Sequence, residues 1–282
     1  MTPVVSVRGL TKSYDDFEAL NGIEFEINAG EVFGLLGPNG AGKTTTIEIL
    51  EGYRRRDAGE VEVLGADPET AGLGWRGRIG VVLQSSAMYE NLTVAEQLAQ
   101  FAGYYEHPRP VDDVIELIGL EEKRDTRARR LSGGQRRRLD LGLALIGDPE
   151  LIFLDEPTTG FDPGARRRAW ETIRSLSSLG KTILLTTHYL DEVEQLADRL
   201  AVLREGRIVA SGTVQELVAG TPATEIRYRR NGEFVVLETD EPTRVLHELT
   251  EAAIRRGEEL EGLEVRRPSL EEVYLSLTQE DK

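Results

Sequence analysis

The sequence predicts an α/β fold built on a mainly parallel β-sheet. A glycine-rich loop joins a short apolar run at 32–36 to a segment with helical spacing at 45–50. Two further apolar runs, 151–154 and 182–185, each end close to acidic or histidine side chains that could take part in binding or catalysis. Short, continuously apolar runs are typical of the buried strands of a parallel sheet. Because the carboxyl ends of such strands share one edge, we expect ligands to bind there.

The glycine-rich loop has the pattern Gly-x-x-x-x-Gly-Lys-Thr, which is typical of phosphate binding. Its residues are Gly37, Pro38, Asn39, Gly40, Ala41, Gly42, Lys43 and Thr44. We expect glycines 37, 40 and 42 to permit backbone angles that other residues resist, so that successive N–H groups point at a phosphate chain. The following helix, from Thr45 onward, adds its positive N-terminal end. Lys43 is expected to reach the terminal phosphates and Thr44 to give its hydroxyl to Mg²⁺.

Two carboxylates, Asp155 and Glu156, end the apolar run 151–154. Adjacent side chains on a strand point to opposite faces, so the two acids need different roles. Asp155 suits the Mg²⁺ shell, directly or through water, and Glu156 suits the polarising of an attacking water. Without the upstream loop, a strand end capped by solvated acids would be the simpler interpretation. Together, loop and acids predict hydrolysis of a nucleoside triphosphate.

A third motif, Leu131-Ser132-Gly133-Gly134-Gln135, lies between these two. With it, the chain resembles the ATP-binding cassette (ABC) transporter ATPases over roughly residues 3 to 218. The resemblance implies ATP, Mg²⁺, and a P-loop NTPase core with an antiparallel β subdomain and an inserted helical subdomain at about 85–140. In this family the signature motif begins a helix and contacts the nucleotide held by the opposite subunit. A second copy of the chain, or a homologous ATPase, is therefore implied as a partner.

The resemblance assigns further residues one by one. Tyr14 matches the aromatic that stacks on adenine, and His188 matches the histidine that grips the γ-phosphate. Gln84, after the apolar run 79–83, matches the glutamine that touches Mg²⁺ and links the core to the helical subdomain. Asp162 matches the aspartate that crosses the dimer interface, although Phe161 stands where the family has an aliphatic residue. Ordinary strand-end or strand-edge positions are the alternative for Tyr14, Gln84 and His188.

The segment 85–140 shows helical patterns of its own. Thr93-Val94-Ala95-Glu96 has the form of a capping box, and Pro110 opens a second helix that Gly119 ends. In ABC ATPases this insertion and the loop after Gln84 receive a coupling helix from the membrane subunit. The candidates for that contact are Met88, Tyr89 and Leu92, unless they pack inside the subdomain.

A different composition begins after Gly220, so we expect an ATPase domain at 1–220 and a small α+β module at 221–282. Asn231-Gly232 predicts a hairpin, a helical stretch follows around 244–255, and Ser269 with Glu272 predicts a capped last helix. That helix is expected to dock on the strands of the module or on a second subunit through Leu270, Val273, Tyr274 and Leu277. The tail resembles those of bacterial ABC exporter ATPases of the drug, antibiotic and glycolipid type.

Composition limits the alternatives. The chain has no cysteine, which excludes disulfides and fits a reducing cytosol. No stretch approaches the ~18 to 20 apolar residues of a membrane helix, so we expect a separate permease chain to form the pore. We expect this chain to be cytoplasmic and peripheral on the inner face of the membrane through that permease. A net charge of −16 argues against general affinity for nucleic acid.

The sequence therefore predicts the ATPase subunit of an ABC transporter, most simply an exporter of drugs, antibiotics or lipid-linked compounds. Two alternatives stay open, namely a soluble ABC ATPase that remodels a macromolecular complex, and an importer ATPase. A GTPase is disfavoured because the ABC signature, rather than a guanine-specific Asn/Thr-Lys-x-Asp element, follows the phosphate loop. The transported molecule is left open.

Overall fold

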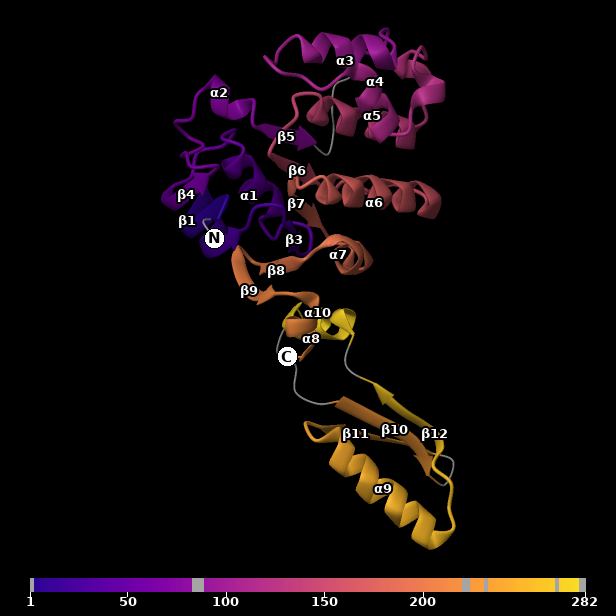
Figure 1. Ribbon diagram of the computed structural model, residues 1–282. Coiled ribbons are helices and arrows are strands. Elements are labelled where there is room, and N and C mark those ends of the chain that lie inside the picture. Colours follow the sequence, from indigo (N-terminus) through magenta and orange to yellow (C-terminus); the bar gives the residue numbers. More distant parts are fainter. Residues whose placement is uncertain (1–2, 83–88, 220–223, 231–232, 267–268, 279–282) are drawn as a thin grey trace. The chain divides into compact units, whose positions relative to one another are not determined.

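The computed structural model describes residues 3–82, 89–219, 224–230, 233–266 and 269–278 of the 282-residue chain. It divides into two compact units, Met1–Ser211 and Gly212–Lys282 (Figure 1). The boundary expected from composition lay at Gly220, after a short helix that this division gives to the second unit. No helix in these ranges is long and apolar enough to cross a lipid bilayer.

Six strands form the central sheet of the first unit, in the order β5-β6-β7-β3-β8-β9. Their bounds are Val32–Leu36 for β3, Ile79–Val82 for β5, Leu151–Asp155 for β6, Thr182–Thr187 for β7, Arg199–Arg204 for β8 and Arg207–Gly212 for β9. Neighbours from β5 to β8 run parallel. Every residue of β3, β6 and β7 is buried, as a strand covered on both faces requires. The predicted α/β fold with a mainly parallel sheet is confirmed.

Different elements cover the two faces of this sheet. One face carries helix α1 (Lys43–Leu50), the short helix α2 (Leu73–Arg76) and an antiparallel sheet of order β2-β1-β4. The strands of that sheet are β1 (Val5–Tyr14), β2 (Phe17–Ile27) and β4 (Ala58–Val63). The other face packs against α5 (Gly133–Leu145), α6 (Pro163–Ser178) and α7 (Leu190–Leu196). Phe153 of β6 points to the first face and its neighbour Leu154 to the second, so alternation along one strand serves two cores.

The inserted helical subdomain consists of α3 (Val94–Ala102), α4 (Val111–Leu117), two 3₁₀ helices at Glu121–Lys123 and Ala128–Arg130, and α5 (Figure 1). The predicted capping box is confirmed, because the Glu96 N–H donates to Thr93 Oγ1 and the Thr93 N–H donates to the Glu96 carboxylate. Gly119 follows α4 with a φ of +61°, as a helix-ending glycine does. One apolar cluster runs from α3 and α4 through α5 to the sheet. Helix α5 therefore belongs to the subdomain and to the core at once.

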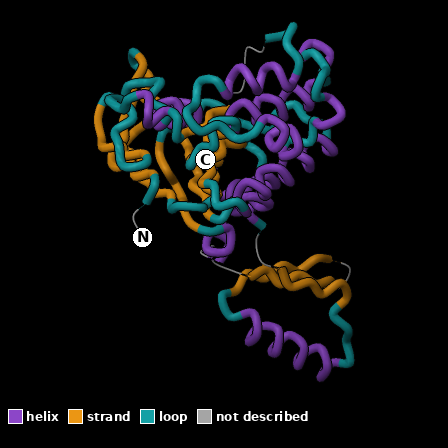
Figure 2. Tube along the Cα trace, turned by 45° about the horizontal axis from the view of Figure 1, so that its top comes forward, coloured by secondary structure: helices purple, strands orange, loops and turns teal. Residues whose placement is uncertain are grey.

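The second unit contains a three-stranded antiparallel sheet of order β11-β10-β12. Its elements are α8 (Val214–Ala219), β10 (Thr224–Arg230), β11 (Glu233–Thr239), α9 (Pro242–Arg256), β12 (Glu261–Arg266) and α10 (Leu270–Thr278). Arg230 pairs with Glu233 at the expected hairpin, whose turn residues 231–232 lie outside the described ones. Helix α9 lies along this sheet in both views (Figures 1 and 2). Buried Ile226 and Tyr228 on the central strand supply the core of the unit.

The last helix, α10, begins with the capping pattern that the sequence predicts, since Ser269 and Glu272 exchange two hydrogen bonds. Leu270 and Val273 are buried, and the main contact of the helix within its unit is with α8. We expected docking on the strands of the module or on a second subunit, whereas the main contact of α10 within the unit is with a helix instead of the strands. The side chain of Leu277 lies outside the described ones.

Candidate nucleotide site

The phosphate loop leaves the carboxyl end of β3 and leads into α1. Gly40 and Gly42 have φ values of +81° and +107°, where residues with a side chain are strained, as expected. Gly37 differs, because its φ is not positive. A Cβ at this position would lie 2.4 Å from the carbonyl oxygen of Leu203. Close packing on β8, and not the backbone freedom that we expected, therefore requires glycine at position 37.

Three charged or titratable side chains meet at the loop. Lys43 Nζ donates to the carbonyl oxygens of Gly37 and Pro38 at 2.8 and 3.1 Å, and lies 3.3 Å from Glu156 Oε1. His188 Nδ1 lies 3.3 Å from the same carboxylate oxygen. Burial alone would raise the pKa of Glu156, but Lys43 and then His188 outweigh it, so the pKa lies below its ordinary value. Glu156 thus forms an ion pair with Lys43 beside the loop.

The backbone turns between Asp155 and Glu156, so the alternation of side chains along a strand does not set the direction of Glu156. Strand β6 ends at Asp155, and Glu156 has a φ of +47°, in the left-handed region. Its N–H donates to Thr186 Oγ1 at 3.0 Å, and Thr159 Oγ1 donates to its carboxylate at 3.1 Å. The two acids diverge because the backbone turns between them, which corrects the expectation that both would stand on the strand.

Asp155 and Thr44 present oxygens of the kind that Mg²⁺ prefers. Thr44 Oγ1 donates to Asp155 Oδ2 at 3.2 Å, and Thr186 Oγ1 donates to Asp155 Oδ1 at 2.5 Å. Burial first, and then the charges of Asp155 and Glu48, raise the pKa of Glu51 to about 8. Thr44 Oγ1 and the Asp155 carboxylate lie within 3.2 Å of each other, and this pair of oxygen donors fits a divalent cation. Gln84, the third predicted ligand, lies outside the described residues.

A hollow of about 530 Å³ opens over the loop, within the size range of small-molecule sites. It is lined by Tyr14, Phe17, Ala19, Asn39, Gly40, Gly42, Lys43, Thr44, Thr45, Glu156, Thr159 and His188. The structure thus brings Tyr14, 60% exposed Phe17 and the phosphate-binding residues to one place. Sequence reasoning missed Phe17 and Thr159. Phe17 could have been found from its position three residues after Tyr14, because the two residues pair across the turn at the tip of the β1–β2 hairpin.

The signature motif lies elsewhere. Ser132 caps α5, since its Oγ accepts from the Gln135 N–H at 3.3 Å and its N–H donates to Gln135 Oε1 at 2.9 Å. Asp162 caps α6 by accepting from the Ala165 N–H at 2.9 Å. Ser132, Gly133, Gly134, Gln135 and Asp162 all line a second hollow, of about 520 Å³. Within one chain, the signature and the phosphate loop thus line different hollows.

Known proteins resemble this chain along its whole length. A family model described as ABC transporter matches residues 20–159. The daunorubicin resistance ATP-binding protein DrrA3 of Streptomyces coeruleorubidus is 38% identical, over 99% of this chain and 96% of that protein. The chain belongs to the ABC transporter family. Nod factor export ATP-binding protein I of Rhizobium johnstonii is 41% identical, over 99% of this chain and 96% of that protein.

Solved structures agree with this assignment. The protein cbiO1 of Clostridium perfringens, described as part of the ABC transporter complex cbiONQ, superposes with a TM-score of 0.71 at 28% identity. The match covers 78% of this chain and 92% of that one. The expected family, fold and activity are confirmed, so the chain is an ATP-binding and ATP-hydrolysing subunit of an ABC transporter.

Proposed function

We propose that this subunit drives export, through a separate membrane-spanning permease, as a dimer that encloses two ATP molecules. The observation that carries the proposal is the extent of the match to the drug-resistance and Nod factor export proteins. It spans 99% of the chain and so includes the C-terminal unit as well as the ATPase core. We place the subunit in the cytoplasm, held against the membrane by the permease.

We assign the adenine to Tyr14 and the phosphates to the N–H groups of the loop, Lys43 and His188. A γ-phosphate competes with Glu156 for Lys43, because both carry negative charge and Lys43 Nζ is only 3.3 Å from that carboxylate. Once released, Glu156 is free to accept a proton from an attacking water. Thr44 and Asp155 are the residues that would hold Mg²⁺, which supplies charge neutralisation at the phosphate oxygens.

The signature is assigned to the nucleotide of a second chain. Ser132 and Gly133 are exposed, and the N-terminal end of α5 behind them favours an anion. Since these residues and the phosphate loop line different hollows in one chain, a partner is needed to bring a signature to each ATP. Exposed Tyr89 and partly buried Leu92 remain candidates for contact with the permease, and Met88 lies outside the described residues.

Replacing Glu156 by Gln tests this assignment. The variant should bind ATP but not turn it over, because the amide cannot accept the proton while the loop and Asp155 stay intact. Sizing chromatography with Mg-ATP should then show a stable nucleotide-bound dimer, and the same variant without nucleotide should elute as a monomer. Wild-type turnover by Glu156→Gln would refute the role of this carboxylate, and a monomer with ATP bound would refute the sandwich.

A further inference from the structure

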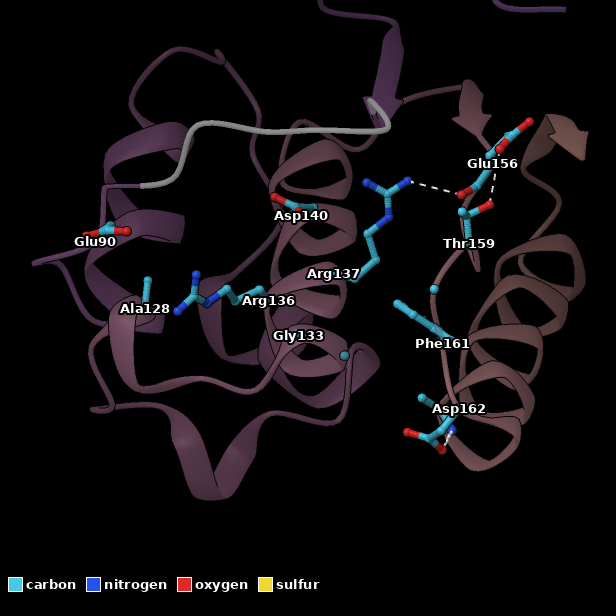
Figure 3. Close-up of a pocket in the computed structure, with 13 residues that line it drawn as sticks. Glu90, Ala128, Gly133, Arg136, Arg137, Asp140, Glu156, Thr159, Phe161 and Asp162 are labelled. Carbon is cyan, nitrogen blue, oxygen red and sulfur yellow. Dashed lines mark hydrogen bonds between the residues drawn. The ribbon is translucent and has the colours of Figure 1, made fainter. Parts of the chain in front are cut away.

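Arg137 on the signature helix reaches out of the helical subdomain to the end of β6. Its guanidinium donates to the carbonyl oxygens of Asp155 at 3.0 Å, Glu156 at 3.4 Å and Pro157 at 3.4 Å. Arg137 and Glu156 both line a groove of about 680 Å³. Figure 3 shows Arg137 projecting from α5 toward Glu156, with a dashed line between them. One planar group thus holds three consecutive carbonyls of the segment that carries the hydrolytic acid.

That segment needs such support. Glu156 has a φ of +47°, and a residue with a side chain stays in this region only when its surroundings fix it there. Thr186 fixes the Glu156 N–H through its hydroxyl and its carbonyl oxygen, at 3.0 and 3.2 Å. Arg137 fixes the peptide carbonyl on the other side of the same residue. The direction of the Glu156 carboxylate therefore depends on both.

The neighbouring arginines do something else. Arg138 donates to the carbonyl oxygens of Ile118 and Gly119, and Arg136 to those of Leu131 and Arg129, all inside the helical subdomain. Of these three arginines, Arg137 alone bonds to β6 and the residues after it within the part of the chain that the structure describes. Phe161 lines a small apolar gap together with Pro157 and Arg137, and the three bonds of Arg137 are partly buried.

We propose that Arg137 is a positioning residue that ties the signature helix to the hydrolytic Glu156 of the same chain. The inference rests on the proposed function, in which Ser132 at the start of that helix engages the nucleotide of the partner. Any displacement of α5 on engagement is then passed by Arg137 to the backbone of Glu156. The two ATP sites of the dimer are linked through each chain by this side chain, so ATP turnover should be cooperative in ATP.

Three variants test the link, with ATP affinity, kcat, the Hill coefficient for ATP and the melting temperature measured for each. Arg137→Ala should lower kcat about 10- to 100-fold and remove cooperativity, while ATP affinity changes about twofold or less. Arg137→Lys should recover only part of kcat. The lysine keeps the positive charge, but an ammonium group cannot span three carbonyls. The matched control Arg138→Ala loses the same charge from the same helix, and should keep the cooperativity and most of kcat.

Wild-type kcat and cooperativity in Arg137→Ala would overturn the inference. So would an equal loss in Arg138→Ala, which would mean that intact packing of α5 matters rather than the link. Should Arg137→Ala not fold, Arg137→Lys carries the test, and a normal kcat in that variant would also overturn it. A wild-type chain that hydrolyses ATP as a monomer would instead contradict the proposed dimer, and is recognised separately by sizing chromatography.

Discussion

The two halves of the ATP machinery differ in how completely a single chain builds them. In the phosphate-loop half, Lys43 is 5% exposed and Asp155 is 4% exposed, and both already have partners in the chain. In the signature half, Ser132 and Gly133 are exposed, and the capping box with Gln135 is local. The first half is organised before ATP arrives. The second is an exposed surface, and we propose that it acts on the nucleotide bound by a second chain.

The largest effects should come from one variant in each half, because a change in the phosphate loop should lower ATP affinity and a change in the signature should lower turnover. Lys43→Ala should weaken ATP binding roughly 10- to 100-fold, because a charge-assisted contact to phosphate disappears. Ser132→Arg should instead lower turnover by about 100-fold or more while the ATP affinity of the isolated chain stays near wild type. Binding by fluorescence and turnover by phosphate release measure the two quantities. A large loss of monomer affinity in Ser132→Arg would break the comparison.

Mixing Lys43→Ala with Ser132→Arg tests whether the phosphate loop of one chain works with the signature of the other. A dimer with one chain of each kind keeps one intact pair of phosphate loop and signature, so the mixture should regain part of the turnover that each variant lacks. A mixture no more active than its components would be expected if the sites work only as a strict pair, or if each chain builds its own site.

A smaller effect concerns the buried acid beside the phosphate-loop half. The pKa of Glu51 is raised from 4.5 to about 8, so between these values the folded chain keeps a proton that the unfolded chain releases. Stability therefore falls as the pH rises through this window, and Glu51→Gln should remove that fall. Above pH 8 we expect the variant to be more stable by about 5 kcal/mol, because the pKa is raised by about 3.5 and each pKa unit corresponds to about 1.4 kcal/mol. Urea unfolding of both proteins from pH 5 to 9 measures it, and parallel pH profiles would contradict the assignment.

The smallest effect should come from removing residues 221–282, which make up most of the C-terminal unit. Every residue that lines the hollow over the phosphate loop precedes residue 190. A chain ending after Gly220 should bind ATP with an affinity within about twofold of wild type, because no described residue of the C-terminal unit is among those that line this hollow. Its solubility, dimer stability or coupling to the permease should fall instead. Loss of ATP affinity in a well-folded truncated chain would show that the tail belongs to the site.

Continuous motifs made most of the site predictable. Lys43, Asp155 and His188 each follow a short apolar run, and parallel strands bring such ends to one edge whatever the remaining sequence is. Periodicity and capping signals likewise placed the helices that begin after Thr93 and Ser269. Each of these signals lies within a short stretch of sequence, so the helix or strand end that it predicts can be found without knowing the rest of the fold.

What the sequence could not provide depends on contacts between distant segments. The need for glycine at position 37 comes from a carbonyl of β8, and the turn at Glu156 is held by Thr186 and Arg137. The arginine run 136–138 gave no sign of which side chain would reach β6, because all three positions have the same residue. The apolar stripe of α10 predicted burial but not the helix that covers it.

The central claim, that a second chain completes each hydrolytic site, is tested most directly by turnover per chain as a function of protein concentration. The series should span the dilution over which sizing chromatography with Mg-ATP shows the dimer giving way to monomer. We predict that turnover per chain rises in proportion to the fraction of dimer and vanishes in dilute solution. Constant turnover per chain in solutions that contain only monomer would contradict the claim.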